Sequence, residues 1–422
     1  MPPPPGILFT AFEPSGDDHA CAVIAELRRR HPDLPIFAWG GPKMAAAGAG
    51  VISRTGDDAA MGVAGFRKII EHAGINRRVK RWLAVEGKAH NVGLHVPVDS
   101  PGANFPICRI TRRRGLKIVH LVAPQIWAWA PWRIRKLRRL TDQVLCLLPF
   151  EQQWFLDRGV SAKFIGHPLF DRPLDEAALE GRAEAVAAET PAGATPRLAI
   201  MPGSRPSEMR SCFPILLDAF RRLKVDFPQT AGVVAATRPE AADLLRAIAA
   251  ESGGWPADLS VVSGDTDAVI RWCDFALVAS GTVTLQIARQ RKPMIAVYRP
   301  GKLMYYLLGR WLVSTEVFTL PNLIASGGGG SGGRVHRIIP EFIPHFGDGE
   351  DLAVEVIKLL RRSGYADQQR SDLDLVCRRF EGYHAGVNAA DAIERMLGLG
   401  GRDDERPTAV VRDPVAALQP QA

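Results

Sequence analysis

Residues 6–20 read GILFTAFEPSGDDHA, in which an apolar run leads directly into a polar turn. The apolar residues are continuous rather than alternating with polar ones, which is typical of a strand buried on both faces. A helical pattern follows the turn through about residue 30. This strand, turn and helix therefore predict an α/β fold with a parallel sheet covered on both sides.

The same pattern continues along the chain and then starts again. Further buried strands are predicted at PIFAWG (35–40), LKIVHLVA (116–123), QVLCLLP (143–149) and AKFIGHP (162–168). After an Ala/Glu-rich stretch (174–196), RLAIM (197–201) begins a second series, with strands AGVVAA, LSVVS, FALVAS and PMIAVY and helices at 207–223, 238–251 and 283–290. Because 422 residues exceed what one core usually holds, we predict two doubly wound, Rossmann-like domains with a cleft between them.

The domain boundaries follow from these breaks. The first domain is expected over residues 1–172 and the second over 173–350, with closing helices over 351–399. The composition of residues 400–422 is typical of a disordered tail, and SGGGGSGG (326–333) is typical of a flexible loop.

Composition limits the kind of protein. The net charge of +8 fits an anionic ligand, an anionic membrane surface or nucleic acid, and does not choose among them. The six cysteines show no CxxC spacing, which argues against a disulfide framework or a zinc site and for a reducing setting. No apolar run is long enough to cross a membrane and the start lacks the basic region of a signal peptide, so we expect a cytoplasmic protein.

Two loops of the second domain share a phosphate-binding pattern. In MPGSRPSEMR (201–210), Gly203 lets the backbone approach a ligand, the helix start offers N–H groups, and Arg205 is a bidentate donor. The alternative is an ordinary turn with Ser204 or Ser207 as the N-cap. ASGTVTLQ (279–286) repeats the strand, turn and helix. Both loops follow strands and would face one crevice, which fits a nucleoside diphosphate.

The first domain carries ionisable residues in two such turns. FEPSGDDHA (12–20) contains a dense cluster, of which a capping role for Ser15 or Asp17 accounts for only part: Glu13, Asp17, Asp18 and His19. In VDSPGANF (98–105), Asp99 is either a general base or the acid of a turn before Pro101, and spacing alone favours the turn. DTD (265–267) is predicted to cap a helix and DLD (372–374) lies in a helical stretch, so no metal site is expected.

Three segments combine apolar and basic residues. FRKIIEHAGINRRVKRW (66–82) suits a helix lying on an anionic membrane, with a solvated basic face as the equal alternative. KLMYYLLGRWLV (302–313) is either core or a site for an acyl chain. VAPQIWAWAPWRIRKLRR (122–139) places three tryptophans ahead of a basic helix that Pro131 is suited to start.

Taken in order, these motifs resemble the lipid-A-disaccharide synthase family of GT-B glycosyltransferases. Its N-terminal landmarks are similar to EPSGD (13–17), GPKM (41–44), MG (61–62), VDSPGANF, APQIWAWAPWR (123–133), LPFE (148–151) and FIGHPLFD (164–171). Its C-terminal landmarks are similar to PGSRPSE (202–208), SGTVTLQ (280–286), KPMIAVYR (292–299), LPNLIA (320–325) and IPEF (339–342). The order is unbroken over about residues 6–395, and the combination is specific to this family.

The resemblance implies an inverting, metal-free transfer without a cofactor. The donor would be UDP-2,3-diacylglucosamine, the acceptor 2,3-diacylglucosamine 1-phosphate (lipid X), and the products the β(1→6) lipid A disaccharide and UDP. The first domain would bind the acceptor lipid and the second the UDP-sugar. Asp99 matches the family's candidate base, so the resemblance favours a general base at this position where spacing alone favoured a turn residue. His19 is the rival base, and Arg205 would stabilise the departing diphosphate.

The resemblance also implies two sets of binding residues. Those at UDP would be Gly203, Ser204, Arg205, Glu208, Ser280, Gly281, Thr282 and Gln286. Those at the acceptor and the cleft would be Glu13, Ser15, Gly16, Asp17, Asn104, Trp127, Trp129, Arg133 and Asn322. The expected partners are the two lipid substrates and the anionic cytoplasmic face of the inner membrane, where the protein would be peripheral, with no nucleic acid; a homodimer is allowed.

Some positions depart from the family pattern. The departures are Phe12 for a glycine, Gly102 for the second acid of the Asp99 segment, Ala130 for an arginine, Gln286 for a glutamate, and Pro344 for a glutamine. They support one alternative, a catalytically altered or silent paralogue that binds UDP or lipid. A related UDP-N-acetylglucosamine transferase or epimerase is the other alternative, against which the WAW and LPN landmarks speak.

Overall fold

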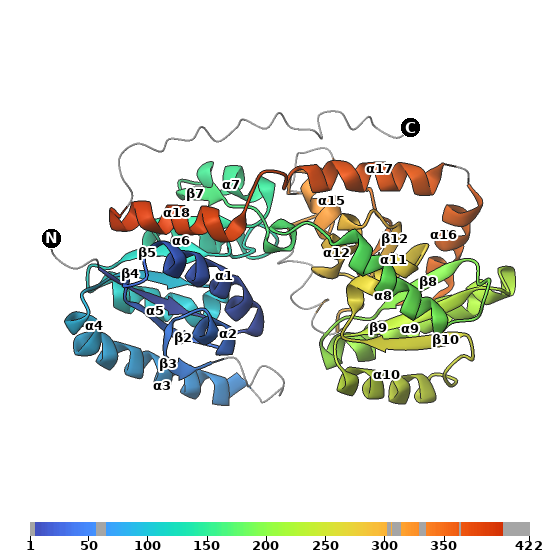
Figure 1. The fold of residues 1–422 in the computed structure, drawn as a ribbon, viewed down its shortest axis with the longest axis horizontal. Helices are drawn as coiled ribbons and strands as arrows, with labels where there is room; N and C mark the ends of the chain where they lie inside the picture. Colours follow the sequence, from blue (N-terminus) through green and yellow to red (C-terminus); the bar gives the residue numbers. More distant parts are fainter. Residues whose placement is uncertain are drawn as a thin grey trace. The chain divides into compact units, whose positions relative to one another are not determined.

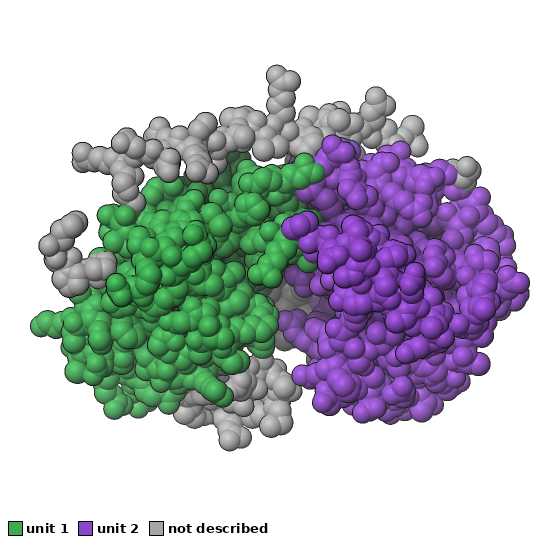
Figure 2. Space-filling view, in the orientation of Figure 1, with its two compact units in different colours: residues 1–172, 380–410 green, residues 173–379, 411–422 purple. Residues whose placement is uncertain are grey.

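The computed structural model describes residues 5–55, 65–301, 305, 314–328, 335–362 and 364–399, with side chains from residue 72 onward in the helix that begins at Gly65. The predicted tail, the MG landmark, and most of segments 302–313 and 326–333 lie outside them. The chain divides into two compact units (Figure 2). Unit 1 holds residues up to Arg172 and the segment from Phe380, and unit 2 holds Pro173–Arg379.

Unit 1 has a seven-stranded parallel sheet in the order β3-β2-β1-β4-β5-β6-β7 (Figure 1). Its strands are β1 (Gly6–Thr10), β2 (Ile36–Gly40), β3 (Gly50–Arg54), β4 (Val92–Pro97), β5 (Lys117–Leu121), β6 (Gln143–Cys146) and β7 (Ala162–Phe164). The strand order reverses beside β1, which gives the predicted doubly wound topology. All the N-terminal stretches predicted as strands form strands. Two strands were not predicted: β3, because GVISR lies partly exposed at the sheet edge, and β4, because Gly93 and His95 interrupt its apolar run.

Helices connect these strands. They are α1 (Pro14–Arg30), α2 (Pro42–Ala46), α3 (Gly65–Ala84), α4 (Glu86–Ala89), α5 (Pro101–Arg112), α6 (Ile134–Leu140), α7 (Pro149–Leu156) and α18 (Ala385–Leu397), with short 3-10 turns η2 (Pro131–Arg133) and η3 (Pro168–Phe170). Pro131 opens η2, which leads into the basic helix α6 that starts at Ile134 rather than at Pro131 itself. The fully buried strand β1 explains the continuous apolar run: Ile7 and Phe9 pack into one core, and Leu8 packs into another.

The basic helix α3 corrects one prediction. Among its described side chains, Ile75, Val79 and Leu83 are buried in the same core as Leu8. The apolar side chains of its described part, from residue 72 onward, are therefore used inside unit 1. Apart from Ala84 at its end, the exposed residues of its described part are basic: Arg77, Arg78, Lys80 and Arg81. The alternative of a solvated basic face holds for the described part of the segment.

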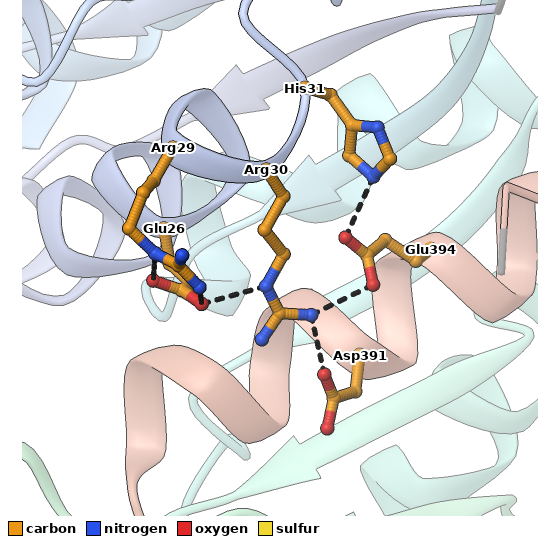
Figure 3. A network of polar contacts seen from close by, with 6 residues as sticks. All are labelled: Glu26, Arg29, Arg30, His31, Asp391 and Glu394. Atoms are coloured by element: carbon orange, nitrogen blue, oxygen red, sulfur yellow. Dashed lines mark hydrogen bonds and ion pairs between the residues drawn. The ribbon is translucent and has the colours of Figure 1, made fainter. Parts of the chain in front are cut away.

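The C-terminal helix α18 packs beside α1 within unit 1 (Figure 1). At the end of α1, the Arg30 guanidinium bonds Glu26 at 2.7 Å, Asp391 at 2.6 Å and Glu394 at 2.8 Å (Figure 3). His31 Nε2 lies 2.8 Å from the other oxygen of Glu394. These contacts join α1 and α18, which are far apart in sequence. The predicted closing helices are divided between the two units: α18 belongs to unit 1, while α16 (Glu350–Arg361) and α17 (Tyr365–Arg378) belong to unit 2.

Unit 2 has a six-stranded parallel sheet in the order β10-β9-β8-β11-β12-β13. Its strands are β8 (Arg197–Met201), β9 (Ala231–Ala236), β10 (Leu259–Ser263), β11 (Phe275–Ala279), β12 (Met294–Val297) and β13 (Glu341–Phe342). The other helices are α8 (Glu176–Ala188), α9 (Pro206–Asp226), α10 (Pro239–Glu251), α11 (Thr266–Trp272), α12 (Val283–Arg289) and α15 (Leu320–Ala325). All the strands and helices predicted for the second series are present. Asp265 caps α11 by accepting from Ala268 N at 3.1 Å, as predicted.

Within the described ranges, no helix combines the length and apolarity that a membrane crossing needs. All six cysteines are free thiols.

Candidate active site

The loop after β4 holds Asp99 in an unusual conformation. Asp99 and Ser100 both have left-handed backbone, with φ of 44° and 37°. Non-glycine residues rarely adopt this region, and consecutive ones need support from their surroundings. Asn104 supplies part of it: Nδ2 donates to the carbonyls of Val98 and Asp99, each at 2.9 Å. The predicted residues Asp99 and Asn104 are therefore held together.

Buried hydrogen bonds fix Asn104 in turn. Its Oδ1 accepts from Thr10 Oγ1 at 2.6 Å, and Thr10 Oγ1 also bonds His95 Nε2 at 2.9 Å. Burial lowers the pKa of His95 to about 3, and the nearby His120 adds to the shift, so the ring is neutral. Sequence patterns alone gave no sign of this support, because Thr10 and His95 lie within the buried strands β1 and β4.

A side-chain hydrogen bond joins the loop after β1 to the Asp99 loop. Ser100 Oγ donates to Glu13 Oε1 at 2.9 Å. Burial raises the pKa of Asp99, a hydrogen bond from the Ser100 amide opposes the shift, and the charge of Glu13 adds to it. A carboxylate with a raised pKa is a stronger base, so the loop suits proton abstraction from an alcohol.

The other ionisable residues of the first loop have separate surroundings. Burial lowers the pKa of His19, with Asp18 opposing. Its Nδ1 has no hydrogen-bond partner within the described part of the chain, and its ring lies edge-on to His167 with centroids 6.3 Å apart. Ser15 is exposed, whereas Gly16 is buried, where an added Cβ would approach Ala11 Cβ to 3.2 Å.

Asp17 caps the next helix rather than its own. Its carboxylate accepts from the backbone N–H groups of Gly41 at 3.1 Å, Lys43 at 3.0 Å and Met44 at 3.0 Å, at the start of α2. A Cβ on Gly41 would lie only 2.3 Å from Asp17 Oδ2, so glycine is needed there. Asp17 thus joins the EPSGD and GPKM segments, and its buried oxygens are already occupied by these amides.

The three tryptophans of the loop after β5 differ in their exposure to solvent. Trp127 is buried, and its Nε1 donates to Glu151 Oε1 at 2.9 Å. Trp129 is 47 % exposed, with the Arg133 guanidinium 5.2 Å from its ring centroid. Trp132 is 60 % exposed. Trp127 therefore anchors the loop, while Trp129 and Arg133 are available at the surface of unit 1.

In unit 2, the loop after β8 is shaped by Glu208. Gly203 has a φ of 99°, and a Cβ there would lie 2.9 Å from Glu208 Cβ. Glu208 Oε2 accepts from the amides of Ser204 and Arg205, each at 3.2 Å, and Oε1 accepts from Arg205 Nη1 at 3.0 Å. The N-cap of α9 is Arg205, not Ser204 or Ser207, because Glu208 reaches back to the amides that a serine would have capped.

The second loop with the phosphate-binding pattern (279–286) lies at the same end of the sheet as the loop after β8. Strands β8 and β11 are neighbours, with Met201 opposite Val278, so the loops at their carboxyl ends emerge side by side. Ser280 is half-buried, and Gly281 and Thr282 are exposed, with open space where a Gly281 side chain would be. Gln286 is half-buried on α12. These predicted UDP-binding residues are therefore gathered around two adjacent turns.

Tyr298 is a neighbour of this group that sequence reasoning missed. It follows β12, the next strand of the sheet. Burial raises the pKa of its phenol, and the charge of Glu208 adds to the shift. Asn322, in contrast, is fully buried: Oδ1 accepts from Ile338 N at 2.8 Å and Ile339 N at 2.9 Å. Asn322 therefore positions the backbone of unit 2 rather than presenting its amide at the surface.

Across the part of the chain that is described, no group of three or more His, Cys, Asp or Glu residues could hold a metal ion. The aspartates of the two candidate pairs have other partners: Asp265 caps α11, and Asp374 pairs with Arg291 at 2.6 Å and Arg378 at 2.8 Å.

Comparison with solved structures identifies the fold. The chain is similar to a UDP-GlcNAc 2-epimerase from Neisseria meningitidis bound to UDP-GlcNAc, with a TM-score of 0.59, 10% identity and coverage of 93% and 99% of the two chains. It is also similar to CalG4, the calicheamicin glycosyltransferase, with a TM-score of 0.57, 15% identity and coverage of 94% and 99%. Such distant likeness shows the two-domain Rossmann-like GT-B fold and does not separate transferase from epimerase.

Comparison of sequences distinguishes the transferase from the epimerase. The family model described as lipid-A-disaccharide synthetase matches residues 7–381. The lipid-A-disaccharide synthase of Solibacter usitatus is 34% identical over 394 residues, covering 93% of this chain and 98% of the relative. That of Geobacter sulfurreducens is 29% identical over 392 residues, covering 93% and 97%. The chain belongs to the lipid-A-disaccharide synthase family of glycosyltransferases.

Proposed function

We propose that this protein transfers 2,3-diacylglucosamine from UDP-2,3-diacylglucosamine to 2,3-diacylglucosamine 1-phosphate, giving the β(1→6) disaccharide and UDP. The observation that carries the proposal, within a chain of this family, is the Asp99 loop. Two consecutive left-handed residues fixed by Asn104 and Glu13 hold a carboxylate whose pKa burial has raised. Strain that surrounding side chains maintain in this way is typical of catalytic positions.

In the proposed reaction, Asp99 accepts the proton of the acceptor hydroxyl. The freed oxygen attacks the anomeric carbon from the face opposite the leaving group, the bond to the diphosphate breaks, and the configuration inverts. The carboxylate must be ionised to act, so the rate falls as the pH falls through the raised pKa of Asp99.

His19 is the rival base. Burial lowers the pKa of its imidazole, so the ring is neutral near pH 7 and able to accept a proton. Asp99 is favoured because Asn104 and Ser100 tie its loop to neighbouring elements, whereas His19 Nδ1 has no such bond among the described residues.

The UDP leaving group is assigned to unit 2. Gly203 gives the loop its left-handed turn, and Arg205, with its side chain 71% exposed, is free to turn from Glu208 to a phosphate. The turn at 280–282 adds exposed polar groups from the next strand. Donors placed where charge develops stabilise the departing diphosphate without a metal ion.

The lipid substrates call for contact with a membrane surface, for which the segment after Trp127 is suited. Trp129 and Trp132 are exposed next to Arg133 and Lys136, and Lys136 Nζ lies 4.7 Å from the Phe105 ring centroid. Exposed tryptophans beside cations are typical of a peripheral protein on an anionic surface, which we assign to the cytoplasmic face of the inner membrane. Binding to anionic vesicles should weaken as salt rises, and salt-independent binding would contradict this assignment.

The direct test uses purified protein with both lipid substrates and follows disaccharide and UDP by mass spectrometry. The proposal expects one UDP for each disaccharide. UDP binding without turnover would favour the silent paralogue that Gly102, Gln286 and Pro344 suggested. A homodimer remains a prediction, which sedimentation equilibrium checks.

A further inference from the structure

Glu151 is a buried carboxylate that the proposed reaction does not use. It lies in the first turn of α7 and is 2 % exposed. The ion pairs of the described residues do not include it; its partners are the indole Nε1 of Trp127 at 2.9 Å and the amide of Leu148 at 3.0 Å. Burying a carboxylate without a cation is costly, so its presence beside the tryptophan-rich loop calls for an explanation.

The sheet topology places this pair beside the candidate base. Strands β4, β5 and β6 are consecutive in the sheet. Asp99 follows β4, Trp127 lies in the loop after β5, and Glu151 follows β6. The Asp99 amide also donates to the carbonyl of Leu121, the last residue of β5, at 2.9 Å. Three neighbouring loops of unit 1 are therefore joined by hydrogen bonds at one edge of its sheet.

The surroundings of Glu151 make its charge sensitive to pH. Burial raises the pKa of Glu151 to about 7, hydrogen bonds from the Leu148 amide, the Trp127 indole and the Leu147 amide oppose the shift, and the charge of Asp99 adds to it. The other titratable neighbour is Cys146 at the end of β6, where burial and Glu151 together raise the thiol pKa well above its ordinary value. Cys146 therefore stays neutral near pH 7, and Asp99 is the charged residue whose repulsion acts on the Glu151 carboxyl.

The two hydrogen bonds require two acceptor oxygens. An ionised carboxylate offers one to the Trp127 indole and one to the Leu148 amide. After protonation, the oxygen that carries the hydrogen becomes a much weaker acceptor, so one of the two bonds is weakened. In a glutamine at this position, the NH2 group cannot accept a hydrogen bond, so one of the two bonds is lost.

We propose that Glu151 is a positioning residue, whose carboxylate fixes the indole of Trp127, and with it the loop 122–133, beside Asp99. The consequence for catalysis rests on the proposed function, but the geometry can be tested without it. Glu151 acts on the acceptor side only, since all of its partners lie in unit 1. Loss of the Glu151 carboxylate should therefore change the KM for the acceptor and leave the KM for the UDP-sugar unchanged.

The structural test is an NMR titration of indole N–H groups in ¹⁵N-tryptophan-labelled protein. Trp127→Phe assigns the Trp127 signal, and Trp154→Phe, on the same helix as Glu151, is the matched control. We expect the Trp127 signal to shift with a midpoint near pH 7, as set by the Glu151 carboxyl, and to stop titrating in Glu151→Gln. A signal that does not titrate in the wild type, or one that still titrates in Glu151→Gln, would overturn the inference.

The kinetic test compares Glu151→Gln with Glu381→Gln, an exposed glutamate of unit 1. In Glu151→Gln, the acceptor KM should rise about tenfold, as expected for one mismatched buried bond, with the donor KM unchanged. Adding Glu151→Gln to Trp127→Phe should cost little more, because both remove the same contact. Additive losses, or equal loss for both substrates, would contradict the inference. Wild-type protein that makes no disaccharide would refute the proposed function instead, and the NMR outcome would still decide the positioning role.

Discussion

The loops after β4 and β8 both follow inner strands of parallel sheets, yet they are built in opposite ways. The β4 loop forces non-glycine residues into left-handed backbone and holds them with buried side chains, above all Asn104. The β8 loop uses Gly203 for its left-handed turn and leaves Arg205 largely exposed. A base must be fixed and partly desolvated, whereas a diphosphate site must offer reachable donors. The difference matches the two tasks of a glycosyltransferase.

The largest effect on turnover is expected from replacing the candidate base in the loop after β4. Asp99→Asn keeps the size of the side chain but removes the acceptor of the proton, so kcat should fall about 10²- to 10⁴-fold. Steady-state rates for wild type, Asp99→Asn and His19→Ala check this. A near-normal rate in Asp99→Asn together with a collapsed rate in His19→Ala would move the base to His19.

The second loop is tested by Arg205→Ala. Losing a charge-assisted donor to the departing diphosphate should lower kcat/KM for the UDP-sugar about 10²- to 10³-fold. Stability should barely change, because the Arg205–Glu208 pair is exposed on the arginine side. Arg210→Ala, one turn further along α9, is the matched control. Equal losses in both variants would mean that general charge, not the loop, binds the diphosphate.

The sequence predicted the second of these loops far better than the first. Gly203 and Arg205 stand in a contiguous strand–turn–helix pattern whose function depends on backbone N–H groups, which local sequence reveals. The Asp99 loop depends on Asn104, Thr10 and His95, which come together only when β1 and β4 pair. Spacing alone therefore favoured a simple turn at Asp99, and only the family resemblance pointed to a base.

The same physical limit explains other outcomes. Buried strands such as β1 and β8 were predictable because their apolar runs are continuous. Edge strand β3 has no such run and was missed. The basic helix α3 was open to two interpretations, since its pattern does not tell whether its apolar side meets the sheet or a membrane.

Weakening the support of the first loop should have a smaller effect than removing the base. Asn104→Ala removes the amide that donates to the carbonyls of Val98 and Asp99 and the oxygen that accepts from the Thr10 hydroxyl. Unfolding free energy should fall by about 1–3 kcal/mol, as for other unsatisfied buried groups, and kcat should fall with it. Urea unfolding and kinetics on Asn104→Ala and Asn104→Asp check this; unchanged kcat in a destabilised Asn104→Ala protein would show that the loop does not need the amide.

The smallest effect is expected far from both loops, at the contact between α1 and α18. Hydrogen bonding to Arg29, followed by Arg30, lowers the pKa of Glu26 to about 2. A carboxyl whose folded pKa lies below its unfolded value stabilises the fold above that unfolded value, near 4.5, and the contribution is lost as pH falls toward 2. Arg30→Ala should therefore cost about 1 kcal/mol at pH 7, where solvent screening limits the gain.

That cost should shrink as the pH falls from 5 to 3, while the rate of turnover stays at the wild-type value. Thermal melts of wild type, Arg30→Ala and the exposed control Arg113→Ala measure it. A pH-independent difference would mean that Arg30 acts through packing and not through the carboxylates that surround it (Figure 3).

Calorimetric titration of UDP into Asp99→Asn and Arg205→Ala tests the division of tasks most directly. If unit 1 supplies the base and unit 2 binds the diphosphate, Asp99→Asn binds UDP as the wild type does although it no longer turns over. Arg205→Ala should then lose about tenfold or more in UDP affinity, as expected for a charge-assisted bond. Weakened UDP binding in Asp99→Asn with wild-type binding in Arg205→Ala would contradict the account.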